Sequence, residues 1–156
     1  MTIEPARAEH AAAMAELWER LGYATSAGDL ERRLSGFDTA LHLTRVAVSE
    51  GDVVGFVHVF RSDRLDEEPF AELGGVIVAE AFRDRGVGRR LMRSAERWAQ
   101  RSGCALLRVR SRADRGEAHR FYERVGYRRT KRQQVLEKEL RRGTPGHRRS
   151  SEEGRE

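Results

Sequence analysis

Apolar positions along the chain follow two different periods, which predict helices and strands in alternation. Four apolar residues spaced three to four positions apart predict a first helix that ends at Gly22: Met14, Leu17, Trp18 and Leu21. A second short helix is predicted over 29–35, with Asp29 as its cap. Residues 41–61 form two β-rich runs around the polar stretch 49–52, which is typical of a hairpin.

The second half of the chain continues this alternation. An acidic insert, 62–69, precedes an apolar strand at 71–78, and a long helix is expected from Gly86 onward. Three more elements follow: a strand at 104–111, a helix at 114–125 closed by Gly126, and one or two strands within 127–140. A strand, a helix and a further strand over 71–110 form a parallel crossover. The pattern therefore predicts a mixed α/β sheet.

The length of 156 residues is that of one domain, which we expect over 1–140. Residues 141–156 have no apolar period and predict a disordered basic and polar tail. The apolar run 53–60 is too short to span a bilayer, and the N-terminus lacks a signal-peptide centre, so a cytoplasmic location without a membrane partner is expected. The single Cys104 and the scattered histidines predict neither a disulfide nor a metal site.

The net charge of +5 raises the question of a nucleic-acid partner. Most of the basic residues are arginines interspersed with acidic residues, which is typical of a solvated surface, so no nucleic-acid partner is expected. One local concentration of arginine remains, in the stretch RDRGVGRR at 83–90.

This stretch lies where a strand gives way to a helix, and such a helix N-terminus attracts anions. Its first N–H groups lack intrahelical partners, and the helix dipole adds partial positive charge. Gly86 and Gly88 allow close approach to the backbone, while Arg83, Arg85 and Arg89 add charge. The predicted ligand is a phosphate or pyrophosphate, although the two glycines taken alone favour a plain glycine cap before a surface helix. A Walker loop is excluded because no Gly-Lys-Ser/Thr follows.

Two motifs together resemble the GNAT superfamily of N-acetyltransferases. The first is the acyl-CoA signature R/Q-x-x-G-x-G/A, matched by Arg83, Gly86 and Gly88 after a strand containing Val76 and Val78. The second is an alanine followed by F/L-Y-E-x-x-G-F/Y, and the stretch EAHRFYERVGY at 117–127 matches it. The resemblance implies a mixed, mostly antiparallel sheet of six to seven strands with about four helices, in which strands four and five splay around acetyl-CoA.

The resemblance also implies roles for individual residues. The strand residues Val76, Ile77 and Val78 would pair with the pantetheine arm, and Tyr122 would be the general acid for the departing thiolate. The pyrophosphate would bind the loop amides, here those of Asp84, Arg85, Gly86, Val87, Gly88 and Arg89. A competing interpretation is that Tyr122 is a core residue, since it shares a helical stripe with Phe121.

The general base is less well indicated. Many family members carry a carboxylate at the position of Gly74, and Glu72 lies two residues earlier, on the same face of a regular strand. We therefore predict Glu72 as a base acting through water, with His58 and His119 as alternatives. A frequent asparagine of the family is replaced by Arg115.

The acceptor is predicted to be a small-molecule amine, because the segment 117–140 is similar to acetyltransferases of the aminoglycoside type. The acidic insert at 62–69 could attract a cationic amine, or it could be a solvated loop. Protein N-terminal or lysine acetylation, and an acyl-CoA-binding module without turnover, remain alternatives. In this family late strands often pair between subunits, so a homodimer is possible.

Overall fold

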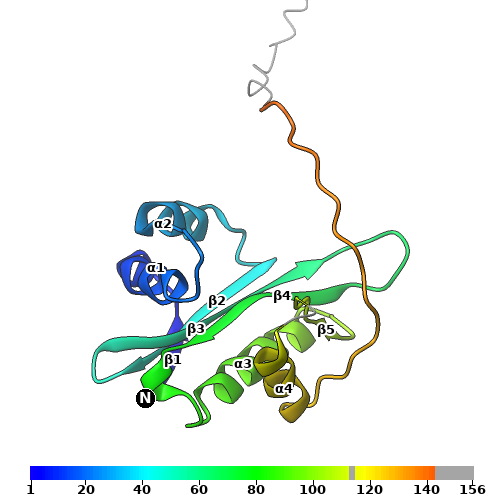
Figure 1. The fold of residues 1–156 in the computed structure, drawn as a ribbon. Coiled ribbons are helices and arrows are strands. Elements are labelled where there is room, and N and C mark those ends of the chain that lie inside the picture. Colours follow the sequence, from blue (N-terminus) through cyan, green and yellow to red (C-terminus); the bar gives the residue numbers. More distant parts are fainter. Residues whose placement is uncertain (113–114, 143–156) are drawn as a thin grey trace, which may run out of the picture.

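The computed structural model describes residues 1–112 and 115–142, and its centre is one sheet (Figure 1). Within these residues the sheet has five strands in the order β1-β2-β3-β4-β5. Their bounds are β1 Thr2–Pro5, β2 His42–Ser49, β3 Asp52–Ser62, β4 Phe70–Val78 and β5 Leu107–Arg108. The first three pairings are antiparallel and β4–β5 is parallel, which confirms the mixed, mostly antiparallel sheet.

Helices cover both faces of this sheet. In Figure 1, α1 and α2 lie above the sheet, and α3 and α4 lie below it. The helices are α1 Ala11–Glu19, α2 Ala27–Gly36, α3 Val87–Arg101 and α4 Gly116–Arg124, with short 3-10 turns η1 Ala8–His10 and η2 Glu80–Phe82. Alternation along β3 and β4 divides the core: Phe56 and Ile77 pack toward α1, whereas Val57 and Val59 pack toward α3. None of the described helices is long and apolar enough to cross a membrane.

Local sequence explains where several elements begin and end. The hairpin predicted around 49–52 joins β2 to β3, and α3 begins directly after Gly86. The predicted cap of α2 is wrong: Ser26 precedes the helix, and its hydroxyl accepts a hydrogen bond from the Asp29 amide at 3.1 Å. A cap residue must lie before the first helical turn to reach its free amides, and Asp29 lies within that turn.

The expected count of six to seven strands is wrong for the described residues, which contain five. The strand predicted at 104–111 is reduced to Leu107–Arg108, and 127–142 forms no strand. A further strand needs an edge to pair with, and the two-residue β5 offers very little. The segment instead runs past β5 and away from the domain (Figure 1). Residues 143–156 of the predicted tail lie outside the described part of the chain.

Candidate functional site

The loop between β4 and α3 has a backbone that can surround an anion. Asp84 and Gly86 both adopt left-handed conformations, with φ of 61° and 78°. Alternation of left-handed and ordinary residues turns successive N–H groups toward a common centre. No Cβ contact within 4 Å limits Gly86, so its backbone angle is the reason for glycine there.

The first turn of α3 adds free donors to this loop. Arg90 N is the first helical amide to bond back, to Gly86 O at 3.0 Å. Among the described residues, the amides of Val87, Gly88 and Arg89 have no backbone acceptor. Three N–H groups and the positive end of a 15-residue helix therefore meet at one point, where anions bind readily.

Three arginines lie around the start of α3, where they contact backbone carbonyls and an aromatic ring of neighbouring residues. The Arg83 Nε donates to the Val78 carbonyl at 3.3 Å, and the Arg85 guanidinium lies 5.4 Å from the centre of the Phe82 ring. Arg89 Nη2 lies 3.5 Å from the Arg124 carbonyl. These contacts are exposed and no carboxylate takes part, so the guanidinium groups keep their charge for a ligand.

The second half of β4 presents an open backbone edge next to this loop. The strands β4 and β5 pair only at Ala71↔Leu107 and Glu72↔Arg108. Ala79 N donates to Val54 O, toward β3, and amides alternate between the two edges of a strand. Val76 and Val78 therefore direct their backbone groups away from β3, toward the side where β5 has ended. An extended ligand could pair with that edge as a strand would.

Gly88 joins the two motifs in space. A Cβ at this position would lie 3.0 Å from the ring of Phe121, on α4, and 3.7 Å from Cγ2 of Val78. The glycine therefore lets α4 pack against the first turn of α3. This packing role was not visible in the sequence, where Gly88 appeared only as a site of close anion approach.

Other residues of the second motif also hold α4 in place. Gly126, with φ of 98°, ends the helix, and Tyr127 N bonds back to Tyr122 O at 2.9 Å. The Tyr127 hydroxyl donates to Glu96 of α3 at 2.8 Å. Phe121, Gly126 and Tyr127 thus have structural roles, and the ring of Tyr122 packs against the same core cluster as Phe121 and Tyr127.

Tyr122 is partly buried, and its hydroxyl has no hydrogen-bond partner among the described residues. Burial raises the pKa of this phenol, while the nearby Arg115 opposes the shift. Its ring contacts Phe121 and Tyr127, with centroid distances of 5.4 and 6.2 Å. The hydroxyl is protonated at neutral pH and free to donate.

β4 contains a β-bulge at Gly74 and Gly75, and these two glycines face the side of the sheet that carries α1. His58↔Gly75 is followed by Val59↔Leu73, so Gly74 has no partner on β3. A Cβ at Gly74 would overlap the Nδ1 atom of His58, whose ring occupies the space above this glycine. At Gly75 the nearest atom to such a Cβ is Trp18 Cζ2, at 3.6 Å.

His58 belongs to a stacked cluster. Its Nε2 lies 3.1 Å from Nδ1 of His42, with the two rings nearly coplanar, at 7°. Phe37 stacks on both imidazoles, at centroid distances of 4.1 Å from His42 and 5.1 Å from His58. Burial lowers the pKa of His58 to about 4, and repulsion by His42 adds to the shift. His58 is therefore neutral at neutral pH.

Glu72 lies where β4 and β5 are still paired, and it forms an ion pair with Nε of Arg110. Ala71 and Leu73 pack in the α3 core, so the side chain of Glu72 lies on the face that Gly74 shares with His58. Arg110 also donates to Gln133 Oε1 at 2.8 Å. His119, the other alternative base, lies on α4, 3.5 Å from Arg129 Nη2.

The acidic insert at 62–69 is largely neutralised by arginines. Asp63 pairs with Arg61 at 3.0 Å, and Asp66 pairs with Arg64 at 3.2 Å. Arg108 binds both oxygens of Glu67 at 3.0 Å, and these hydrogen bonds lower the pKa of that carboxyl. The insert is therefore not a free anionic surface.

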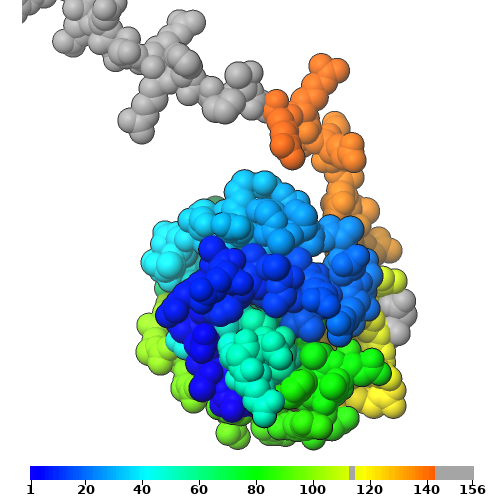
Figure 2. All heavy atoms as spheres, turned by 90° about the vertical axis from the view of Figure 1, so that its left-hand side faces the viewer, coloured from blue at the N-terminus to red at the C-terminus, as the bar shows by residue number. Residues whose placement is uncertain are grey.

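Two grooves open on the face carrying α1. The larger, of about 780 Å³, is lined by α1, the start of β3 and residues 79–82; Figure 2 shows these segments side by side in blue, teal and green. A smaller pocket of about 80 Å³ adjoins it and reaches Ile77, Val78 and Arg83. Space thus extends from the end of β4 toward α1. Among the described residues no group of histidine, cysteine or acidic side chains is arranged to hold a metal ion.

Three aromatic residues at this site were not singled out from the sequence. Tyr23 lies between Trp18, at a centroid distance of 6.1 Å, and the Arg115 guanidinium, at 5.5 Å. Phe37 completes the histidine cluster. Trp18 and Tyr23 lie on either side of the end of α1, and Phe37 directly follows α2. Nothing in the neighbouring sequence marks these three residues as site residues.

Comparison with known families gives one match that covers most of the chain. The sequence profile of the Acetyltransferase (GNAT) family matches residues 6–127.

Curated relatives match over shorter stretches. An aminoalkylphosphonate N-acetyltransferase of Salmonella typhimurium is 31% identical over 84 residues, which are 53% of this chain and 54% of that protein. An aminoglycoside N(6′)-acetyltransferase type 1 of the same organism is 26% identical over 91 residues, 56% of this chain and 63% of that protein. The alignment thus spans little more than half the length of these relatives.

Solved structures share the fold over most of the chain. An aminoglycoside 6′-N-acetyltransferase from Acinetobacter haemolyticus has a TM-score of 0.78 at 21% identity, over 90% of this chain and 100% of that one. An aminoglycoside N-acetyltransferase in complex with CoA has a TM-score of 0.79 at 20% identity, and the match covers 89% of this chain and 95% of that one. The five described strands and four helices therefore form a known α/β fold.

Proposed function

Because the chain belongs to the acetyltransferase (GNAT) family, we propose that it transfers an acetyl group from acetyl-CoA to a primary amine of a small molecule. The observation that carries this proposal is the packing of α4, which carries the free phenol of Tyr122, against the open anion site at the start of α3, through the contact of Phe121 with Gly88. The catalytic unit is residues 1–140. The named relatives, which act on aminoalkylphosphonates and aminoglycosides, support a small-molecule acceptor.

The donor side of the site is built mainly from backbone. The open edge of β4 would pair with the pantetheine arm through the backbone groups of Val76 and Val78, whereas those of Ile77, which was also expected to pair, point toward β3. The amides of 84–89 would hold the pyrophosphate, with the charges of Arg83, Arg85 and Arg89 around it. The residues present therefore fit acetyl-CoA, whose thioester supplies the activated acetyl group. The free thiol Cys104 is buried, in keeping with the cytoplasmic location that we propose.

Tyr122 acts as general acid toward the departing thiolate. Proton transfer from a phenol with a pKa of about 10 to a thiolate whose conjugate acid has a pKa near 8.5 is uphill by about 2 kcal/mol. Burial raises the pKa of Tyr122 and adds to this difference, while Arg115 reduces it. The same burial keeps the phenol protonated, so the donor is present throughout the neutral range.

The acceptor amine must lose a proton before it attacks. For an alkylammonium with a pKa of about 10.4, this costs about 4 to 5 kcal/mol at neutral pH. Glu72 acts as the base through water, from the point where β4 and β5 begin to diverge. Arg110 holds this carboxylate in place.

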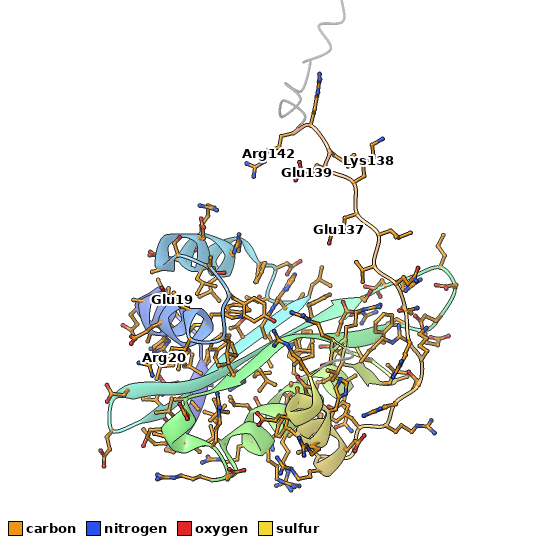
Figure 3. All side chains as sticks on the ribbon, in the orientation of Figure 1. Glu19, Arg20, Glu137, Lys138, Glu139 and Arg142 are labelled. Atoms are coloured by element: carbon orange, nitrogen blue, oxygen red, sulfur yellow. The ribbon has the colours of Figure 1, made fainter. Side chains whose placement is uncertain are left out.

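A homodimer is also part of the proposal. Val135, Leu136 and Leu140 are 80, 89 and 81% exposed on the segment that follows Gln133, whose side chain accepts a hydrogen bond from Arg110. Figure 3 shows the side chains of Glu137, Lys138, Glu139 and Arg142 on this segment, clear of the domain. A second copy could cover these apolar residues, and light scattering coupled to gel filtration measures the mass.

The test of the enzymatic proposal is thiol release from acetyl-CoA over a panel of amines, with Tyr122→Phe compared to wild type. We expect kcat to fall at least a hundredfold while acetyl-CoA affinity, measured by calorimetry, stays the same. Tyr127→Phe is the matched control: it removes the hydrogen bond to Glu96 and lowers stability, with kcat within a few-fold of wild type. Equal rates for Tyr122→Phe and wild type would contradict the proposal.

A further inference from the structure

Arg115 lies close to Arg108 and Arg110 in the sequence but, unlike these two, has no acidic partner among the described residues. It is half-buried, and among the described residues no carboxylate lies within ion-pair distance of it. Its guanidinium lies over the Tyr23 ring at 5.5 Å and is close enough to Tyr122 to oppose the rise in its pKa. By contrast, Arg108 and Arg110 are paired with Glu67 and Glu72.

The position of Arg115 lies on the path that an acceptor would take. Tyr23 contacts Trp18, and Trp18 lies 3.6 Å from the Cβ position of Gly75 in the bulge of β4. An aromatic surface therefore runs from the bulge to Arg115, across the side of β4 that faces α1. Arg115 also lies close enough to Tyr122 for its charge to act on the phenol, so this surface leads toward Tyr122.

The charges around this surface favour one class of acceptor. A polycationic amine would need free carboxylates, yet three of the four acidic residues of the insert are paired with arginines. An unpaired guanidinium beside the reacting groups repels such an amine and attracts an anion. A planar guanidinium also matches carboxylate and phosphonate oxygens, which it can bind through two hydrogen bonds.

We propose that Arg115 binds an anionic group of the acceptor, so that the substrate is an amine carrying a phosphonate or carboxylate a few bonds from its nitrogen. This rests on the acetyltransferase function proposed above. The amine attacks the thioester carbonyl carbon, the carbon–sulfur bond breaks, the thiolate takes the proton of Tyr122, and the nitrogen loses its proton to water and Glu72. Arg115 holds the far end of the acceptor and takes no part in bond making.

The experiment compares three acceptors of similar length but different charge, 2-aminoethylphosphonate, β-alanine and ethanolamine, and adds spermidine as a longer polycationic amine. With wild-type enzyme we expect kcat/KM for one or both anionic amines to exceed that for ethanolamine at least tenfold, and spermidine to be the poorest. Arg115→Met should remove this preference, raising KM for the anionic amines at least tenfold and changing kcat/KM for ethanolamine less than threefold. Comparison of the first two acceptors identifies phosphonate or carboxylate.

The ratio between acceptors separates this role from others. Loss of the charge near Tyr122 would slow all acceptors equally, and loss of a contact to acetyl-CoA would weaken its binding in calorimetry. If Arg115→Met slows all acceptors equally or weakens acetyl-CoA binding, and the kcat/KM ratio of anionic amines to ethanolamine does not change, the proposal is overturned. A wild-type preference for spermidine would also overturn it. The control is Arg120→Met, which replaces an exposed arginine of α4 and should behave as wild type. Thiol release with none of the four acceptors or any other amine would instead refute the acetyltransferase function.

Discussion

The two sides of β4 hold sites of different construction. On the donor side, the open edge of the strand, the left-handed residues Asp84 and Gly86 and the first turn of α3 offer backbone groups. On the proposed acceptor side, side chains from separate parts of the chain line the bulge and the surface next to it. His58, stacked with Phe37 and His42, lies over Gly74, and Trp18 lies near Gly75. Tyr23 contacts Trp18, and Arg115 lies over Tyr23.

This difference has a physical consequence for specificity. A backbone site depends on chain conformation, which a few glycines determine locally, so it suits a ligand that all relatives share. A side-chain site changes with each substitution, so it suits a ligand that differs between relatives. The donor side should therefore respond to changes in backbone freedom, and the acceptor side to changes in charge and volume.

The largest expected effect concerns acid stability on the acceptor side. Burial lowers the pKa of His58 from 6.5 to about 4, so between these values the unfolded chain binds a proton that the folded chain does not. Stability is therefore lost as pH falls from 6.5 to 4, by about 3 kcal/mol. Urea unfolding at several pH values measures this slope. His58→Gln and His58→Phe should both flatten it, and a slope equal to that of wild type in both would rule out this origin.

Much of the donor side was predictable from sequence because its signals are local. The strand, the glycines and the helix start lie within 71–101, and the structure has them in that order. The crossover and the hairpin were predicted for the same reason. Two predictions failed where tertiary context decides: Ser26 rather than Asp29 caps α2, and 127–142 finds no edge long enough to pair with.

The acceptor side was not predictable because its residues meet only in the folded chain. Gly74 appeared in the sequence as a missing carboxylate, whereas the structure fills the space above it with His58. The neutralisation of the acidic insert depends on Arg108, which lies 41 positions from its partner Glu67. Arg115 appeared only as a departure from a family pattern, and its contact with Tyr23 places it at the end of the aromatic surface that we propose as the acceptor path.

Two neighbouring glycines of the bulge offer a matched test of how tightly the acceptor side is packed. A methyl at Gly74 overlaps His58, which is held by His42 and Phe37, so Gly74→Ala should lower the free energy of unfolding by about 2 kcal/mol. The methyl of Gly75→Ala would contact only Trp18, at ordinary van der Waals distance, and this substitution should change the free energy of unfolding by less than about 0.5 kcal/mol. Urea midpoints measure both. A His58→Ala background should relieve the Gly74→Ala loss, and equal losses at the two glycines would contradict this account of the bulge.

The smallest expected effect tests the one donor-side glycine that also has a packing role. A methyl at Gly88 would lie 3.0 Å from the Phe121 ring, so α4 must shift slightly, and Gly88→Ala should lower stability by about 1 kcal/mol. In a Phe121→Leu background the methyl has room, and the loss should shrink, which a double-mutant cycle from urea unfolding measures as coupling. Equal losses in both backgrounds would mean that Phe121 does not limit this position. Coupling would mean instead that the first motif needs a small residue at Gly88 partly because the second motif packs there, so the donor loop and Tyr122 are positioned by a shared contact.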